Sequence, residues 1–283
     1  MRTGYLGPPG TYSEEALQKL TAGRDDVEAV PLVSVPDCFE SVASGEIPQV
    51  LVPIENSIEG PVNQTLDLLA AADGSLLIMA EIAHPIRHHL VAREPLDLTE
   101  IDRVISHPQA TAQCAGFLRA NLPDAEVRAA QSTAHAVQGL AEGNGTTAAI
   151  GSLRAADLYG ASILAEDIAD EESNTTRFAL IGQEPAPATG PGRFRTSIVC
   201  AIQRDRPGAL LAILQELALR GVNLTYLQSR PTKQGLGKYR FFMDLEGSRE
   251  RDLAVAAAIT ALEEQDVADV TFLGSYPAAP AGD

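Results

Sequence analysis

Two hydrophobic periods alternate along the first 184 residues of the chain. Short apolar runs bounded by turn residues, such as Gln49–Ile54, predict buried strands, whereas the apolar spacing of Tyr12–Leu20 and Pro108–Ala120 predicts helices. Strands and helices that follow one another in this way are typical of a mainly parallel sheet covered by helices. The extended, β-rich stretch Leu76–Arg93 separates two such sets, so we expect two α/β lobes with a ligand cleft between them.

A different pattern follows a Pro/Gly/Ala-rich stretch at residues 185–194, which predicts a linker. Beyond it, strand and helix periods follow one another in the ferredoxin-like order βαββαβ. We therefore divide the chain into a two-lobed unit at residues 1–184, the linker, a small domain at 195–276 and a flexible Pro/Ala-containing tail at 277–283.

The charge balance narrows the classes of partner. The chain has 38 acidic residues against 21 Lys and Arg, and this net charge of −17 argues against nucleic acids and anionic membranes as partners. Three widely spaced cysteines without a CxxC motif argue against a disulfide scaffold and fit a reducing compartment. The sequence also shows no signal peptide and no apolar stretch of membrane-spanning length, so we expect a cytoplasmic protein.

The turn Gly7–Glu14 joins the first predicted strand to the first helix. Thr11 and Glu14 have the spacing of a capping box, in which each side chain satisfies one backbone N–H group. The same glycine-bearing turn could instead present free N–H groups to a carboxylate at the helix N-terminus. Spacing alone leaves both interpretations open.

Two further polar segments, Glu55–Ser57 and Ser106–Gln109, come directly after predicted strands. Ligand sites in α/β sheets gather at the carboxyl ends of strands, although such residues are also ordinary turn formers and helix caps. Gln109 and Gln113 are four residues apart and share one helix face, which either binds a polar substrate or meets solvent. The histidines of the segment His84–His89 suggest a metal site, but no HExxH motif or Cys/His pair supports one.

The segment Asn174–Leu180 places two hydroxyls, an amide and a guanidinium at the start of a strand. Thr176 needs no function there, because threonine favours strands. The planar guanidinium of Arg177 suits recognition of a carboxylate, or alternatively a salt bridge that holds the lobes together.

Taken together and in this order, these segments resemble the prephenate dehydratase family. Two segments of the small domain resemble the effector signatures of that family's ACT domain, with Gln228 where the usual signature has Glu. The resemblance rests on Gly7–Ser13, Pro53–Ser57, Ser106–Gln109 with Gln113, Thr176–Phe178, Gly208–Leu211 and Gln228–Pro231.

The resemblance implies a catalytic unit like a periplasmic binding protein, followed by an ACT regulatory domain. It also implies the conversion of prephenate to phenylpyruvate, CO₂ and water without a cofactor or metal. Thr176 would then help the ring hydroxyl to leave, which needs a proton or a strong hydrogen bond at that moment. L-Phenylalanine is implied as the effector at an interface between ACT domains, hence in a homodimer or homotetramer, and no chorismate mutase module is expected.

The resemblance also assigns the site residues. The catalytic set is Thr176, Glu55, Asn56, Ser106 and Gln113. The substrate-binding set is Thr11, Ser13, Ser57, Gln109, Arg177 and Phe178. The effector-binding set is Gly208, Ala209, Leu210, Leu211, Asn223, Gln228, Ser229, Arg230 and Pro231.

Other functions stay open at this point. Arogenate, which carries an amine in place of the keto group of prephenate, is an alternative substrate. A non-catalytic amino-acid sensor built on a lobe pair is an alternative from another class, although sensing needs no hydroxyl such as that of Thr176. The change to Gln228 removes a negative charge near the place where an effector's ammonium would bind, so the effector's identity also stays open.

Overall fold

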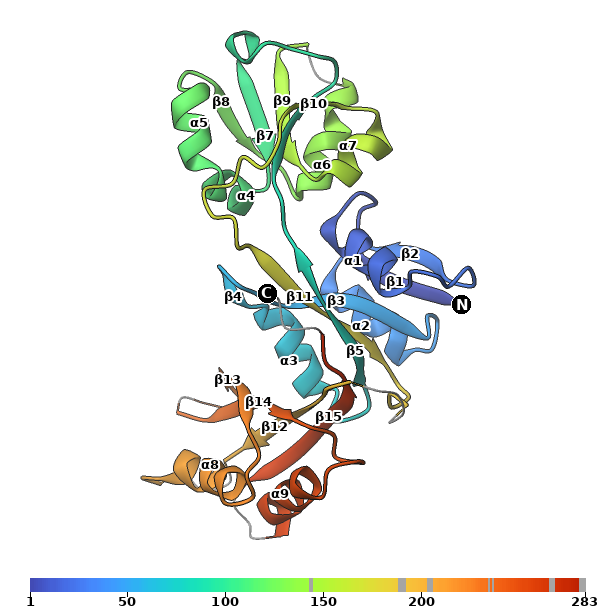
Figure 1. Cartoon of the computed structure of the whole chain (residues 1–283), viewed down its shortest axis with the longest axis vertical. Coiled ribbons are helices and arrows are strands. Elements are labelled where there is room, and N and C mark those ends of the chain that lie inside the picture. Colours follow the sequence, from blue (N-terminus) through green and yellow to red (C-terminus); the bar gives the residue numbers. More distant parts are fainter. Residues whose placement is uncertain are drawn as a thin grey trace.

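The computed structural model describes residues 1–142, 145–187, 192–202, 206–233, 235, 237–264 and 268–279. These residues form three sheets that follow one another along an elongated molecule (Figure 1). The first lobe contains the N-terminal strands, the second lobe lies at one end, and the C-terminal domain lies at the other. This is the α/β architecture that the sequence predicts.

The first lobe contains a sheet in the order β2-β1-β3-β11-β5, with β4 paired to β3. Strands β1, β2 and β3 are parallel, but β11 runs antiparallel between β3 and β5, so the sheet is mixed rather than mainly parallel. The helix that follows β4 begins at Asn63, because Pro61 still pairs with Glu55 in the sheet. The bounds are β1 (Arg2–Leu6), α1 (Tyr12–Leu20), β2 (Glu28–Leu32), α2 (Val35–Ala43), β3 (Gln49–Asn56), β4 (Gly60–Pro61), α3 (Asn63–Ala71), β5 (Leu77–Pro85) and β11 (Thr175–Gly182).

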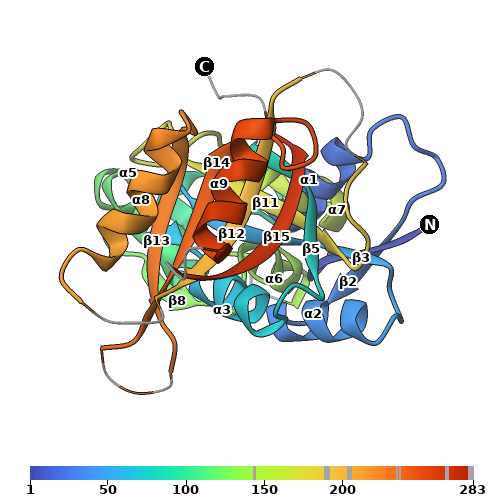
Figure 2. The same cartoon turned by 90° about the horizontal axis from the view of Figure 1, so that it is seen from below.

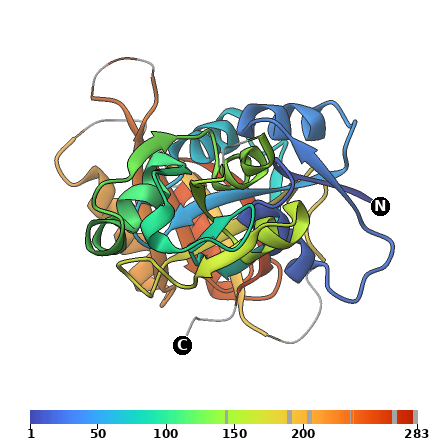
Figure 3. The same cartoon turned by 90° about the horizontal axis from the view of Figure 1, so that it is seen from above.

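The second lobe contains a mixed sheet in the order β10-β6-β9-β7-β8, and its green and yellow elements lie over the first lobe when viewed from above (Figure 3). The single helix expected at 108–120 is broken at Cys114, whose side chain is fully buried and whose backbone angles are not helical (φ −113°, ψ 17°). The bounds are β6 (His89–Ala92), β7 (Arg103–Ser106), α4 (Pro108–Gln113), α5 (Ala115–Asn121), β8 (Glu126–Ala129), α6 (Thr133–Gln138), β9 (Thr147–Gly151), α7 (Leu153–Tyr159) and β10 (Ser162–Ala165), with 3₁₀ turns at Leu98–Glu100 and Gly139–Glu142.

The C-terminal domain has the predicted βαββαβ order, folded into an antiparallel sheet β13-β14-β12-β15 with both helices on one face (Figure 2). Side chains alternate along β12: Ile198 and Cys200 pack against the helices, whereas Val199 joins the core of the first lobe. The bounds are β12 (Phe194–Ala201), α8 (Ala209–Leu219), β13 (Leu224–Pro231), β14 (Tyr239–Glu246), α9 (Leu253–Glu264) and β15 (Asp269–Pro277).

The C-terminal domain packs closely against the first lobe. Phe242, Leu273 and Tyr276 belong to the same buried cluster as the apolar side chains of β3 and β5. Gly274 makes this approach possible: its φ is +129°, and a Cβ atom there would lie 2.4 Å from the carbonyl oxygen of Ile78. The sheet of the C-terminal domain is therefore fixed to the sheet that carries β11.

The chain end differs from the prediction of a loose tail. Pro277 ends β15, the N–H of Ala278 donates to the carbonyl of Arg193 at 2.9 Å, and the N–H of Ala279 donates to Glu81 at 2.8 Å. Residues 280–283 of the predicted tail, and 188–191 of the predicted linker, lie outside the described residues. No helix in the described part of the chain is long and apolar enough to span a membrane.

Candidate active site

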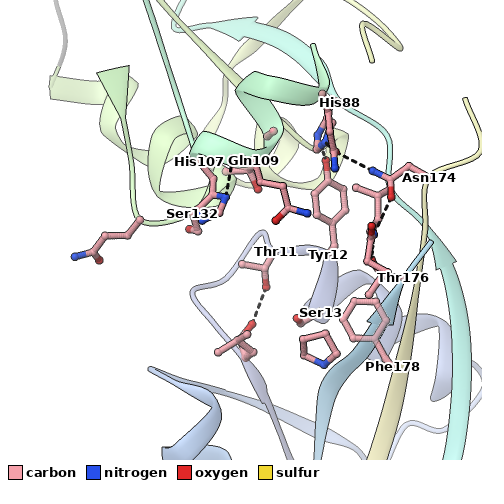
Figure 4. A pocket seen from close by; sticks show the side chains of 18 of the residues that line it. Thr11, Tyr12, Ser13, His88, His107, Gln109, Ser132, Asn174, Thr176 and Phe178 are labelled. Atoms are coloured by element: carbon pink, nitrogen blue, oxygen red, sulfur yellow. Dashed lines mark hydrogen bonds between the residues drawn. The ribbon is translucent and has the colours of Figure 1, made fainter. Parts of the chain in front are cut away.

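A cavity of about 360 Å³ lies between the two lobes. Figure 4 shows His107, Gln109 and Ser132 of the second lobe facing Thr11 and Ser13 of the first lobe. Among the described residues that line it there is no Asp, Glu, Lys or Arg, so polar contacts there come from hydroxyls, amides, imidazoles and backbone N–H groups. The lining residues are Leu6, Gly7, Thr11, Tyr12, Ser13, Val33, Pro53, Asn56, Ile86, His88, His107, Gln109, Ala110, Gln113, Gln131, Ser132, Thr133, Asn174, Thr176 and Phe178.

Three helices begin at this cavity: α1, α4 and α6. The caps of α4 and α6 are side chains, since His107 Nδ1 accepts from the N–H of Gln109 at 3.3 Å and Ser132 Oγ from the N–H of His135 at 3.0 Å. Because the N-terminal end of a helix carries partial positive charge, the three helix starts favour an anion in a cavity without cationic side chains.

Of the two interpretations of the turn before α1, the capping box is wrong. Thr11 makes no cap hydrogen bond and donates its hydroxyl to the carbonyl of Leu6 at 3.0 Å, while Glu14 accepts from the N–H of Gly10 at 2.5 Å. The glycine-bearing turn is thus held by Glu14, and Thr11 does not block the first-turn N–H groups of α1.

Thr176 lies at the start of β11, directly opposite Asn56 on β3, and its side chain is buried. Asn56 Nδ2 donates to Thr176 Oγ1 and to Asn174 Oδ1, each at 2.8 Å. Since Thr176 accepts the hydrogen bond from Asn56, its own hydrogen is available for a group in the cavity.

A chain of hydrogen bonds continues from Asn174 into the second lobe. Asn174 Nδ2 donates to Gln113 Oε1 at 2.9 Å, His88 Nε2 lies 2.9 Å from the same oxygen, and His88 Nδ1 lies 3.0 Å from the hydroxyl of Tyr12. Burial lowers the pKa of His88 and raises that of Tyr12, so both groups are neutral near pH 7. The network therefore joins both lobes through neutral side chains, and Gln113 Nε2 also donates to the carboxylate of Glu59 at 3.5 Å.

The cavity lining lacks four of the predicted catalytic and substrate-binding residues, namely Glu55, Ser57, Ser106 and Arg177. Ser106 is fully buried, and its hydroxyl donates to the carbonyl of Ile150 at 2.8 Å. Ser57 donates to the carbonyl of Ser173 and accepts from the N–H of Thr175, which fixes the chain just before Thr176. Glu55 lies on β3 with a carboxylate oxygen 3.2 Å from Arg177 Nε.

Arg177 also differs from its prediction, because its side chain points away from the cavity toward the C-terminal domain. Its Nη1 lies 2.7 Å from Asp244 and 3.2 Å from Glu81, and the guanidinium stacks on Tyr226 at 5.1 Å from the ring centre. Burial alone would lower the pKa of Arg177, but Asp244, Tyr276 and Glu81 outweigh it and raise the pKa. The salt-bridge alternative fits this structure, but the bridge joins the first lobe to the C-terminal domain.

The predicted effector residues lie in the C-terminal domain. Gly208–Leu211 starts α8, with Gly208 in the left-handed region (φ +86°), and Gln228–Pro231 ends β13. Asn223 donates to Glu246 at 3.1 Å and lines a separate cavity of about 650 Å³ with Thr225. Arg230 forms two hydrogen bonds, of 3.1 and 2.9 Å, to the carboxylate of Asp67 on α3. One effector signature is thereby tied directly to the first lobe.

The family model of prephenate dehydratase matches residues 3–186. The chain belongs to the prephenate dehydratase family. The ACT domain model matches residues 196–264, so the C-terminal domain is an ACT domain. Among curated proteins, the prephenate dehydratase of Mycolicibacterium vanbaalenii is 40% identical over 96% of this chain and 90% of its own length.

Two solved structures extend the comparison. A prephenate dehydratase of Arthrobacter aurescens in complex with L-Phe has a TM-score of 0.89 at 38% identity and covers 98% of this chain and 90% of its own. A protein described as GqqA, a quorum quenching acylase, has a TM-score of 0.85 at 29% identity and covers 99% of both chains. The predicted family, its decarboxylating dehydratase activity and the two-part organisation are confirmed for this member of the prephenate dehydratase family.

The predicted site lacks seven polar residues of the cavity: Tyr12, His88, His107, Gln131, Ser132, Thr133 and Asn174. Asn174 could have been found, because it lies two residues before Thr176 and side chains two apart along an extended segment share a face. No spacing in the sequence relates His88 to Gln113, since they are 25 residues apart and meet only in the folded chain.

Proposed function

We propose that the cavity between the lobes converts prephenate to phenylpyruvate and that the hydroxyl of Thr176 donates to the leaving ring hydroxyl. The observation that carries this proposal is the hydrogen bond from Asn56, which leaves the Thr176 hydrogen free to point into the cavity. In the reaction the ring carboxylate departs as CO₂, its bonding pair enters the ring, and the ring hydroxyl takes a proton and leaves as water. Aromatisation drives this step, so a neutral donor suffices to assist it.

The lining of the cavity suits a dianion held by neutral donors. The start of α1 at Ser13 supplies uncapped N–H groups for a carboxylate, and Phe178 provides an apolar wall for the ring. Gln113 and Asn56 orient the polar groups, whereas Ser57, Ser106 and Glu55 support the surrounding backbone and the domain junction.

The test is direct. Purified protein is mixed with prephenate near neutral pH, and phenylpyruvate is followed against the uncatalysed reaction. If phenylpyruvate forms only at the uncatalysed rate, the proposal is overturned and a non-catalytic amino-acid sensor becomes the better proposal.

The same cavity favours prephenate over arogenate. Arogenate carries an ammonium where prephenate has a keto group, and none of the described lining residues offers a carboxylate to pair with it. Burying an unpaired charge is costly, so we expect kcat/KM for arogenate to be at least about tenfold lower, a difference of about 1.4 kcal/mol. Parallel assays with both substrates check this, and equal values would contradict it.

The likeness to an acylase calls for one control, because a shared fold does not fix the chemistry. Amide hydrolysis by a hydroxyl needs a neighbouring base to take its proton. Thr176 instead has the amide of Asn56 beside it, which cannot accept a proton. We therefore expect no cleavage of an N-acyl homoserine lactone under conditions in which prephenate is consumed.

We also propose that L-phenylalanine inhibits the enzyme through the ACT domain, as the complex of the Arthrobacter relative with L-Phe suggests. The second signature lies on β13, which contacts the first lobe through Tyr226 on Arg177 and Arg230 on Asp67. Leu211, Leu219 and Leu227 are exposed on α8 and β13, which supports a homodimer or homotetramer formed through ACT domains. Three buried, unpaired cysteines support a cytoplasmic location.

Substitution of Asp67 by alanine tests whether the inhibitory signal passes from the ACT domain to the first lobe through this residue, separately from effector binding. If the Arg230–Asp67 pair transmits the signal, both Asp67→Ala and Arg230→Ala raise the L-phenylalanine concentration for half-inhibition by at least about fivefold. Asp67 lies outside both proposed binding sites, so uninhibited turnover of Asp67→Ala stays unchanged. Inhibition curves of Asp67→Ala that superimpose on the wild type would show that Arg230 acts only at the effector.

A further inference from the structure

The hydrogen bonds around Thr176 have a direction that is fixed by the backbone. Asn56 Oδ1 accepts from the N–H groups of Ile58 and Glu59, each at 3.0 Å. Rotating this amide by half a turn would place its NH₂ group against two N–H groups, so the amide has one orientation. The NH₂ group of Asn56 must therefore face Thr176 and Asn174.

The order of donors and acceptors that begins at Asn56 continues residue by residue into the second lobe. Asn174 accepts with Oδ1, so its NH₂ group donates to Gln113 Oε1. That oxygen can only accept, and His88 Nε2 lies 2.9 Å from it, so the hydrogen of neutral His88 is on Nε2. The hydroxyl of Tyr12 lies 3.0 Å from the other ring nitrogen, Nδ1, and donates its hydrogen to the carbonyl of Arg87 at 2.6 Å.

We propose that His88 is a positioning residue that holds Gln113, at the far end of this network, in the orientation that matches the direction set at Asn56. The inference rests on the proposed role of Thr176. Without the N–H of His88, the amide of Gln113 is held only by the NH₂ group of Asn174 and by a long bond of 3.5 Å from its own Nε2 to Glu59, so it can turn and present its NH₂ group to that of Asn174. If Asn174 turned in response, two NH₂ groups would meet at Asn56, whose own orientation is locked. The conflict would displace Asn56 or Asn174 and with them the hydroxyl of Thr176.

The surroundings of His88 fit a fixed role better than that of a proton donor. The side chain is 3% exposed and is held at both ring nitrogens. Should it be protonated, Nδ1–H would donate to Tyr12, whose hydroxyl already lies 2.6 Å from the carbonyl of Arg87. The bond from Nε2–H to Gln113 is the same in both forms, so the direction toward Thr176 does not depend on the charge of His88.

Two substitutions separate the donor from the ring. In His88→Phe the donor is lost, and we expect kcat with prephenate to fall by about 10- to 100-fold while KM changes by less than about threefold. In His88→Gln the side-chain NH₂ group can take the place of Nε2–H, and we expect kcat within about fivefold of the wild type with an unchanged kcat–pH profile. His88→Asn, which is polar but too short to reach Gln113, is expected to behave like His88→Phe and serves if the latter does not fold.

A double-variant comparison tests whether His88 acts through Thr176. In the Thr176→Val background, His88→Phe or His88→Asn is expected to cause no further loss of kcat, because no hydroxyl remains to be oriented. Equal losses in both backgrounds, a His88→Gln variant as poor as His88→Phe, or the loss of one limb of its pH profile would each overturn the proposal. Wild-type protein without prephenate turnover would instead refute the proposed function.

Discussion

Replacing Thr176 with valine is expected to lower kcat with prephenate by at least about a hundredfold while KM changes by less than about threefold. The hydroxyl assists the leaving group only as the C–O bond breaks, so its loss weakens binding of the transition state far more than binding of the substrate. Valine keeps the branched shape that favours β11, so the strand should be preserved. Steady-state kinetics of phenylpyruvate formation measure both constants.

Thr176→Ser is the matched control, since serine restores the hydroxyl without the methyl group. We expect it to recover most of the lost kcat. An unchanged kcat in Thr176→Val would remove this hydroxyl from the mechanism, and a Thr176→Ser variant as slow as Thr176→Val would assign the effect to packing in the strand.

The spacing of apolar residues along the sequence predicted most helices and strands of the fold. The helix Tyr12–Leu20 has the predicted bounds, because its apolar spacing and its preceding turn agree. The position of β11 between β3 and β5 could not be predicted, since this strand comes from a segment more than a hundred residues further along the chain. The interruption at Cys114 was equally hidden, because nothing in its neighbours marks a helix end.

The residues predicted at the ends of strands divide into two groups, since Asn56 and Gln109 line the cavity whereas Ser57 and Ser106 do not. Thr176 and Arg177 are consecutive in a strand, so their side chains must point to opposite faces. The two side chains therefore cannot both contact one substrate in the cavity. The structure places Arg177 among Glu55, Glu81 and Asp244. The partners of Arg177 come from three strands and two domains, which no local pattern reveals.

This cluster predicts a large effect on stability. The side chains of Arg177, Glu81 and Asp244 are 12%, 2% and 7% exposed. Removing the guanidinium therefore leaves buried carboxylates, for which Arg195, 2.7 Å from Glu81, is the remaining ion-pair partner among the described residues. Removing one partner of a buried ion pair costs about 3–5 kcal/mol, and we expect Arg177→Met to lower the free energy of unfolding by this amount. Urea unfolding followed by far-ultraviolet circular dichroism measures it.

The control for Arg177→Met is Arg87→Met, which breaks an ion pair with Asp167 whose side chains are 61% and 50% exposed. Exposed pairs contribute at most about 1 kcal/mol, so this variant should unfold close to the wild type. Adding Asp244→Asn to Arg177→Met should recover part of the loss, because one stranded carboxylate is then neutral while its hydrogen bond from Ser197 can remain. If Arg177→Met were no less stable than Arg87→Met, the cluster would not hold the ACT domain to the strand that carries Thr176.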